Sequence, residues 1–472
     1  MPHRKRLALF GVLVAGTITV GCYHPLPLTP ETVEKSLTPP SMEAIRIQAK
    51  SVWHPLLKPI DFDERDGLSP DEAAVLAVLA NPSLHSVRDQ RGIAAGQVIQ
   101  AGILPNPTFS GEGEMPVKMP GEVDGYTMGM AWDVSGLISL GTKIKAAKAQ
   151  AASVELDVAW QEWQVAQAAK TAVYRCMGLE LQLAAAEQVE RRLKENAETV
   201  QSAVEEGLTT AVNLAAANAA LEESRAATLD IRQELHKQRV ALNRTLGLPP
   251  AAEVLIQKDV RLPSKVALPP AAELVAGLAD RRLDLVALRR GYDSQEATYR
   301  AAILARFPKV ELGIAHTKDT GNFYTLGPTL GFDIPALDMN QGNIAIERAT
   351  RQKLFDEFTG RVFEARSDIA TLLGEIDSVT QKIAYAEAAV PVLERLVKTC
   401  EAALAGGHMD ILSYYGAQND LAKKRIEILR LKQELVEMQI GLEIASGRYL
   451  AGAKAASAPA AGGQAQQKEA LP

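Results

Sequence analysis

Few residues in this 472-residue chain are of types and spacings that could do chemistry. The sequence contains no Gly-rich phosphate loop followed by Lys, no Gly-x-Ser-x-Gly turn and no His-Glu-x-x-His motif. Its seven histidines are scattered, and no two are spaced as in a zinc-binding helix. These residues are His3, His24, His54, His85, His236, His316 and His408. The sequence therefore predicts that the chain is not an enzyme, and it offers no metal site and no cofactor-binding motif.

One modification site is nevertheless indicated near the N-terminus. Residues 1–21 read as a secretion signal, because basic residues at 4–6 precede an apolar run and small residues come before Cys22. Thr19–Cys22 resembles a bacterial lipobox, in which the cysteine becomes an acylated N-terminus. Tyr23 at the next position, by resemblance to sorted lipoproteins, points to the outer membrane. The alternative is an ordinary signal peptide with an incidental cysteine.

Composition indicates a helical, mildly acidic protein. The chain is 47% hydrophobic and 23% charged but only 5% aromatic, which favours long helices over a compact aromatic-rich core. Loss of the signal removes three basic and no acidic residues, so the formal charge falls from -6 to -9. A basic stripe that could follow a phosphate backbone is absent, which argues against nucleic acid as a partner.

The chain also repeats its own pattern after about 200 residues. Landmarks of the first copy recur in the second, displaced by 200 or 201 positions: Leu84 and Leu285, Pro107 and Pro308, Trp132-Asp133 and Phe332-Asp333, Gly141 and Gly342, Gly207 and Gly407, Leu221 and Leu421. We therefore expect two structurally equivalent repeats, at 68–247 and 269–450, joined by a linker at 248–268. A lipid-anchored, Pro-rich, extended tether is expected at 22–67 and a disordered tail at 451–472.

The longest segment of each repeat is predicted to be a helix, over about 140–205 and about 340–404, each spanning roughly 100 Å. The second carries a heptad stripe that demands a partner helix of similar length, and a return helix supplies one. The stripe comprises Ile369, Leu372, Ile376, Val379, Ile383, Ala386, Val390, Leu393, Val397, Cys400 and Leu404, and the return helix offers Leu421, Ile428, Leu431, Leu435, Met438, Leu442, Ala445 and Tyr449. Pro391 should bend the helix locally. Cys176 and Cys400 should lie far apart along the axis of the long helices, too far for a disulfide. We therefore expect both cysteines to be small core residues.

Each repeat should also contribute one β-hairpin, with strands at 108–115 and 125–134 and at 309–317 and 323–334. Apolar and polar residues alternate along these strands, as in the wall of a membrane barrel with a wet lumen. One face would carry Phe109, Tyr126, Met128, Met130, Trp132, Val310, Leu312, Ile314, Tyr324, Leu326, Leu330 and Phe332, and the other Ser110, Glu112, Thr127, Gly129, Glu311, Thr325 and Thr329. The alternative is two surface hairpins packed on helices. Four strands cannot close a barrel, so several chains would have to share one wall.

The landmarks of the internal repeat, and the order in which they occur, resemble those of the outer-membrane efflux protein family, the TolC-like factors. The resemblance extends from about residue 68 to 450. The resemblance rests on Asn81-Pro82-Ser83-Leu84 and Arg282-Leu283-Asp284-Leu285, on Leu104-Pro105-Asn106-Pro107 and Arg306-Phe307-Pro308, and on the Gly turns between long and return helices. It implies a mainly α fold with a small β part, in which a homotrimer shares a twelve-stranded barrel and a coiled-coil tunnel. It also implies an outer-membrane location with extension into the periplasm.

The same resemblance implies roles for the helix tips. The periplasmic end of the family's tunnel, which meets an adaptor protein, corresponds in this chain to Gly207, Leu208 and Thr209 at one tip and to Gly406 and Gly407 at the other. Asp410 matches an acidic position at the family's pore constriction. The chain departs from the family pattern at Ser413, where a second acidic residue is usual, and in a shorter turn before Asp410. A helix N-cap is the alternative role for Asp410, and both roles can coexist.

The function implied is a passive exit duct of a tripartite efflux (RND-type) or type I secretion system, docked to a periplasmic adaptor and an inner-membrane transporter. Two other classes stay open at this point. One is a periplasmic coiled-coil structural lipoprotein without channel activity, and the other is a periplasmic adaptor, for which the expected strand-rich domain is missing. The sequence does not identify the substrate, the pump class or the adaptor.

Overall fold

The computed structural model describes residues 25–63, 65–117, 121–257 and 261–450. The predicted signal peptide, Cys22 and the predicted tail at 451–472 lie outside these residues. The chain divides into a unit that ends at Pro40 and a unit that begins at Ser41. The first contains one described helix, α2 (Pro30–Leu37), which Thr29 caps by accepting from the Thr32 amide.

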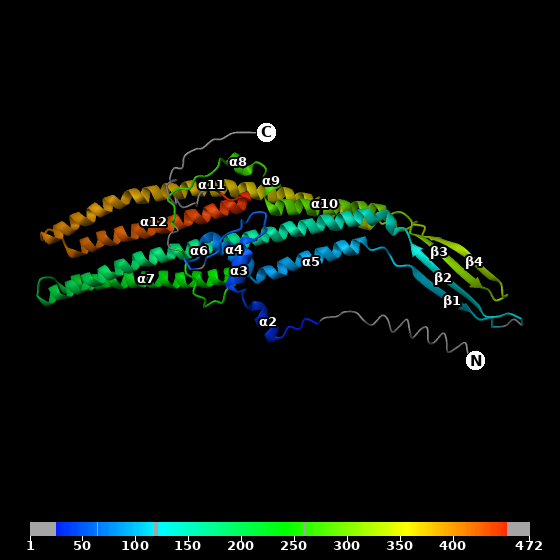
Figure 1. Ribbon diagram of the computed structural model, residues 1–472. Helices are drawn as coiled ribbons and strands as arrows, with labels where there is room; N and C mark the ends of the chain where they lie inside the picture. Colours follow the sequence, from blue (N-terminus) through cyan, green and yellow to red (C-terminus); the bar gives the residue numbers. More distant parts are fainter. Residues whose placement is uncertain (1–24, 64, 118–120, 258–260, 451–472) are drawn as a thin grey trace, which may run out of the picture. The chain divides into compact units, whose positions relative to one another are not determined.

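The second unit holds two copies of one arrangement (Figure 1). In each copy, a helix leads into two strands, and a long helix and a return helix follow. The first copy comprises α4 (Pro70–Ala80), α5 (Ser83–Gly102), β1 (Thr108–Glu114), β2 (Gly125–Asp133), α6 (Gly136–Glu205) and α7 (Ala211–Leu246). The second comprises α8 (Ala271–Val275), α9 (Leu278–Arg281), α10 (Leu283–Leu304), β3 (Val310–Lys318), β4 (Tyr324–Phe332), α11 (Gln341–Ala405) and α12 (Ile411–Ser446), and α3 (Met42–Lys50) precedes both. The predicted internal repeat is confirmed.

The predicted long helices and their coiled-coil partners are present. The 70 residues of α6 span about 105 Å at 1.5 Å per residue. α6 pairs with α7 and α11 pairs with α12. The heptad stripe of α11 packs on α12, because the same cluster of buried residues contains Ile369, Ile376 and Ile383 from α11 and Leu431 and Leu435 from α12.

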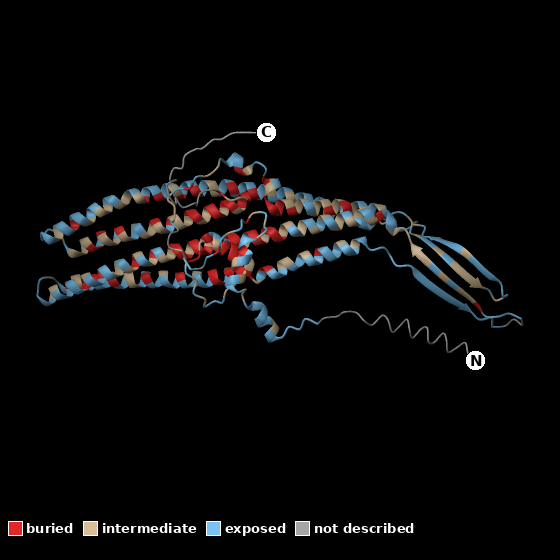
Figure 2. Cartoon of the chain, viewed as in Figure 1, coloured by how far each residue is buried: buried red, intermediate tan, exposed pale blue. Residues whose placement is uncertain are grey.

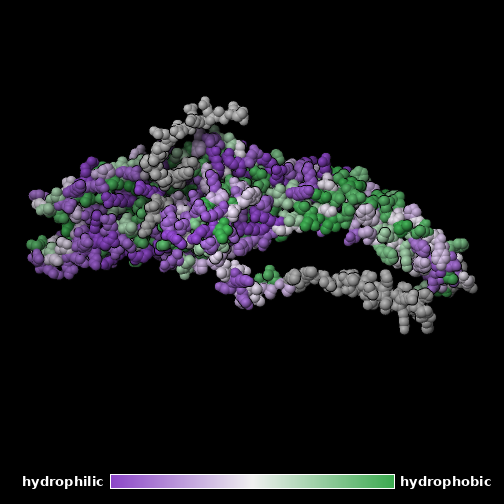
Figure 3. All heavy atoms as spheres, viewed as in Figure 1, coloured by the Kyte–Doolittle hydropathy of each residue, from purple (hydrophilic) through white to green (hydrophobic). Residues whose placement is uncertain are grey.

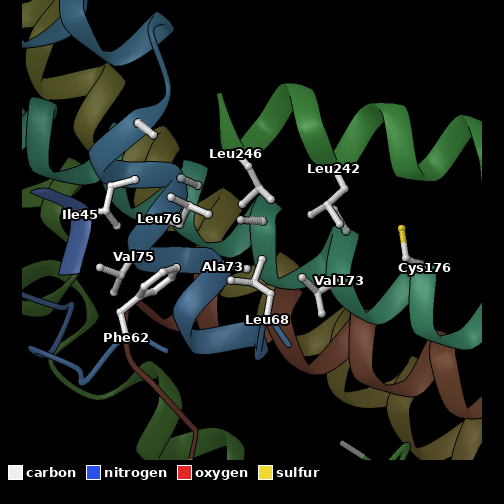
Figure 4. Packing of buried hydrophobic residues seen from close by; sticks show 14 of the residues in the cluster. Ile45, Phe62, Leu68, Ala73, Val75, Leu76, Val173, Cys176, Leu242 and Leu246 are labelled. Carbon is white, nitrogen blue, oxygen red and sulfur yellow. The ribbon is translucent and has the colours of Figure 1, made fainter. Parts of the chain in front are cut away.

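A core lies where α4 packs on α6 and α7, and buried residues gather there in Figure 2. α4 begins with a capping box formed by Ser69 and Glu72, and it is buried on nearly every side. Figure 4 shows Leu76 of this helix among side chains from α3, α6 and α7. The core therefore joins elements from both ends of the first repeat.

The prediction that 22–67 forms only an extended tether is wrong, because residues 30–37 form α2 and the second half of the segment packs into the core. Ile45 and Ala49 of α3 are fully buried, and Leu57 and Phe62 are 4% and 3% exposed. Ile45, Ala49 and Phe62 belong to the core cluster around α4. Prolines in this region interrupt the chain only locally, while apolar side chains between them bury enough surface to hold the segment on the helices.

Each repeat ends on a glycine in the left-handed region. Gly247 (φ 70°) ends α7, and Gly447 (φ 67°) ends α12. A β-carbon on Gly247 would lie 2.3 Å from the carbonyl oxygen of Ala80, and one on Gly447 would lie 2.9 Å from the α-carbon of Arg282. The return helix of each copy thus closes against the residues that open the same copy, and only glycine fits there.

No helix in the described ranges has the length and apolar character needed to cross a membrane.

Candidate functional site

The four strands form one antiparallel sheet in the order β1-β2-β3-β4. Its centre is the pairing of β2 with β3, which joins the hairpins of the two repeats into one sheet. The hairpins therefore do not form the two separate surface elements of the alternative interpretation.

Strand register places the predicted apolar residues on one face. Met130 pairs with Phe109 on one side and with Ile314 on the other, and Leu312 pairs with Leu330. These side chains are exposed, as Leu330 illustrates at 65%. The opposite face carries the predicted Ser110, Glu112, Thr127, Gly129, Glu311, Thr325 and Thr329. An exposed apolar face of this extent needs a non-aqueous partner.

Aromatic side chains lie toward both ends of the apolar face. Phe109, Trp132 and Phe332 occupy the end where the strands meet the helices, and Tyr126 and Tyr324 occupy the far end. Aromatic girdles flank the apolar band of transmembrane β-barrels in this way. The sheet therefore has the side-chain pattern of a membrane wall.

The neighbouring helices follow the order of the strands. α5 packs on α6, α6 on α10 and α10 on α11, and these helices connect directly to β1, β2, β3 and β4 in turn. Both β1 and β4 are edge strands, and α5 and α11 are the outer helices of their layer. Exposed apolar side chains occur on both outer helices, for example Ile99 on α5 and Phe363 on α11. Figure 3 shows hydrophobic residues gathered on one face near the sheet, while hydrophilic residues cover much of the long helix pairs.

The helix tips at the other end of the unit repeat one another closely (Figure 1). Gly207 (φ 76°) and Gly407 (φ 69°) both adopt the left-handed conformation after the long helix. The next residue in each turn, Leu208 or His408, donates its amide to the carbonyl oxygen five residues earlier, at 2.8 Å. This is the Schellman arrangement that ends helices on glycine. Gly406, in contrast, has φ −83° and adopts an ordinary conformation.

A side chain caps the return helix at each tip. Thr210 caps α7 by accepting from the Asn213 amide. Asp410 caps α12, since its Oδ1 accepts from the Ser413 amide at 2.9 Å and its Oδ2 accepts from the Ser413 hydroxyl at 2.7 Å. The Ser413 side chain is the main reason why the pKa of Asp410 is lowered, and the Ser413 amide acts in the same direction. The alternative role of Asp410 as an N-cap is thus confirmed.

The first tip presents apolar side chains to solvent, since Leu208 is 75% and Val212 73% exposed. The Thr209 hydroxyl accepts a hydrogen bond from the side-chain Nδ2 of Asn213 at 2.8 Å. Nothing in the described residues covers this pair of apolar side chains. The prediction that these tips contact an adaptor is treated below as a proposal.

The two described cysteines are free and buried, as predicted. Cys176 lies in the core cluster with Ala169 and Ala172, and burial raises the pKa of its thiol to about 12. A thiol with so high a pKa is unreactive near neutral pH. Within the described residues no group of three or more His, Cys, Asp and Glu side chains could hold a metal ion.

Comparison with known proteins agrees with this description. The family model for "Outer membrane efflux protein" matches residues 79–248 and 274–448. The chain belongs to the outer membrane efflux protein family, as the resemblance of its sequence landmarks predicts. No curated protein sequence matches the chain.

Solved structures share the fold at low sequence identity. A structure of CusC, from work on folding and transmembrane channel formation, is 18% identical and has a TM-score of 0.65, with 81% of this chain and 93% of that one covered. The outer membrane protein VceC of Vibrio cholerae is 17% identical with a TM-score of 0.66, covering 80% and 96%. The MtrE outer membrane channel of Neisseria gonorrhoeae, in its open state, is 16% identical with a TM-score of 0.63, covering 84% and 97%.

Proposed function

We propose that this chain is the outer-membrane exit duct of an efflux or secretion assembly, formed by three copies that close one β-barrel. The observation that carries the proposal is the four-stranded sheet with an exposed apolar face and two free edges. Hydrocarbon does not tolerate unpaired strand edges, so β1 of one copy would pair with β4 of the next. The number three comes from the family, and the helix layer offers free edges at the same two sides.

The test is the assembly state of the full-length protein in detergent. We expect a molar mass of three chains by light scattering and a trimer band on unheated denaturing gels. A monomer by both measurements would contradict the duct. It would favour the second candidate, a periplasmic coiled-coil lipoprotein that acts as a scaffold without channel activity.

Within the assembly, the tips would dock a periplasmic adaptor, which connects the duct to an inner-membrane transporter. Support comes from the two Schellman turns and from the exposed Leu208 and Val212 beside Gly207 and Thr209. Gly406 and Gly407 form the matching turn of the second tip. Substrate would move through the lumen by diffusion, and the chain itself would perform no reaction.

Attachment to the membrane would be reinforced by acyl chains on Cys22, which lies outside the described residues. Buried acyl chains contribute about 0.8 kcal/mol per CH₂ group, so more than one chain anchors firmly. We expect Cys22→Ser to abolish metabolic labelling with palmitate while trimers still form, because the barrel inserts independently. Labelling that persists in Cys22→Ser would remove the lipobox interpretation.

Asp410 would have a second role besides capping. Three copies near the symmetry axis would form a negatively charged ring, which favours cations where the aperture is narrow. We expect Asp410→Asn to keep the start of α12 intact, since Asn caps about as well, and to reduce cation selectivity. Reversal potentials across a salt gradient measure the selectivity, and thermal unfolding followed by circular dichroism measures the cap. Full cation selectivity in Asp410→Asn would show that Asp410 is a cap only.

A further inference from the structure

The N-terminal strap, residues 51–62, crosses the junction of the two repeats. Leu57 belongs to a buried cluster that includes Trp160 and Trp163 of α6 and Leu283 of α10, and Leu56 packs against it. Farther along the strap, the amide of Ile60 donates to the carbonyl oxygen of Ala49 at 3.2 Å. The strap therefore covers side chains from both copies of the repeat.

One side chain, that of His54, fastens the strap to α6. The imidazole is 3% exposed. Its Nδ1 accepts hydrogen bonds from the amides of Leu56 and Leu57, both at 3.0 Å. Its Nε2 lies 2.9 Å from the carbonyl oxygen of Ala159. Since a carbonyl only accepts, the hydrogen atom must be on Nε2, and this neutral form satisfies both nitrogens.

The charged groups that act on the ring come from α5 and α6. Glu162 of α6 lies 4.0 Å from Nε2 through its Oε2, and its own side chain is 8% exposed. This carboxylate is already paired, with Arg88 Nε at 2.6 Å and Arg91 Nη2 at 3.6 Å. Arg91 also pairs with Glu155 of α6, its Nε lying 2.9 Å from Oε2. Two guanidinium groups therefore already balance two carboxylates, and no unpaired carboxylate beside the ring is left to stabilise an imidazolium.

Protonation would be costly for a geometric reason as well. A hydrogen on Nδ1 would point at the amide hydrogens of Leu56 and Leu57, so both hydrogen bonds would be lost and like charges would face each other. Burial is the main cause that lowers the pKa of His54, and Arg91 and Arg88 act in the same direction, against the Ala159 carbonyl and Glu162. The bonded geometry and the surrounding charges favour the same neutral form.

We propose that the hydrogen bonds of His54 form an acid-sensitive contact. At neutral pH this contact holds the N-terminal strap on the junction of the two repeats, and at mildly acidic pH it releases the strap. The ring has its ordinary pKa of about 6.5 when the strap is detached and a lower one when it is docked. The docked state is thus fully favoured above about pH 6.5 and is progressively weakened as the pH falls through 6.5 toward the docked value.

Hydrogen exchange on the full-length, detergent-purified protein tests the proposal. The amides of Leu56 and Leu57 are followed as protection factors, which removes the intrinsic pH dependence of exchange. We expect protection to fall about tenfold between pH 7.5 and pH 5.0, as the loss of two hydrogen bonds would give.

His54→Asn places an amide oxygen near the Nδ1 position and does not titrate, so the protection of Leu56 and Leu57 in this variant should be equal at the two pH values. His54→Ala should be as unprotected at pH 7.5 as the wild type is at pH 5.0.

His236→Asn is the matched control, because His236 is an exposed histidine on α7, and this variant should behave as the wild type does. Protection of Leu56 and Leu57 that is independent of pH in the wild type would overturn the proposal. An equal fall in His54→Asn would also overturn it, since the titrating group would then lie elsewhere. His54→Asn that is unprotected even at pH 7.5 would contradict the role of Nδ1 as acceptor.

Discussion

Leu326→Arg should prevent most of the protein from inserting as trimers, at a cost of roughly 2 to 4 kcal/mol per chain if the residue lies near the membrane midplane. Leu326 is 69% exposed on the apolar face and pairs with His316, two residues inside the Tyr324 end of β4. A guanidinium there would replace an aliphatic chain in hydrocarbon. The measurement is the fraction of trimer recovered from outer membranes relative to wild type.

Thr325→Arg is the matched control, because Thr325 is the neighbouring residue on the opposite face and pairs with Thr317. A lumen is wet, so this variant should assemble normally. If Leu326→Arg assembles like wild type while Thr325→Arg does not, the two faces are assigned the wrong way round. If both assemble normally, the sheet does not face lipid.

Gly247→Ala should destabilise the first repeat by about 3 kcal/mol. The left-handed conformation alone costs a non-glycine residue of order 1 kcal/mol, and the new β-carbon would lie 2.3 Å from the carbonyl oxygen of Ala80. Asn81 next to it bonds the Thr245 carbonyl through Nδ2 at 2.9 Å, so this contact cannot relax without breaking a second one. Thermal unfolding followed by circular dichroism measures the loss.

The control is Gly374→Ala, in the middle of α11, where an added β-carbon meets nothing within 4 Å. Alanine favours a helix more than glycine by roughly 0.5 to 1 kcal/mol, so this variant should be slightly stabilised. Equal melting of Gly247→Ala and wild type would show that α7 does not close against the start of its repeat.

Patterns with a short period were the most predictable part of the fold. The heptad stripe of α11 gave the face that packs on α12, and the alternation in β1 to β4 gave the residues that share each face of the sheet, because each pattern is imposed locally by helix or strand geometry. The sequence also predicted a Gly turn between the long helix and the return helix of each repeat, and the structure forms both turns, at Gly207 and Gly407, as Schellman turns.

Long-range packing was less predictable. Pairing of β2 with β3 joins segments far apart in the sequence, and the sequence indicated two hairpins without showing that they share an edge. Residues 41–62 were expected to be extended because of their prolines, yet Ile45 and Leu57 are buried. His54 gave no signal, because a histidine that bonds backbone groups has no characteristic spacing in the sequence.

At the second tip, one of the two roles of Asp410 was predictable from the sequence. An acid just before a helix predicts an N-cap, and its bonds to Ser413 confirm that role. A charged ring would also need three copies at known positions, which a single chain does not define. Its role in selectivity therefore stays a prediction.

Electrical recording from planar lipid bilayers tests the central claim most directly. If three copies close one barrel around a water-filled lumen, purified full-length protein should give discrete, uniform conductance steps. Leu326→Arg should give few such steps and Thr325→Arg steps of normal frequency. Protein that is shown by light scattering to be trimeric, and that inserts into the bilayer without conductance under any applied voltage, would contradict the account.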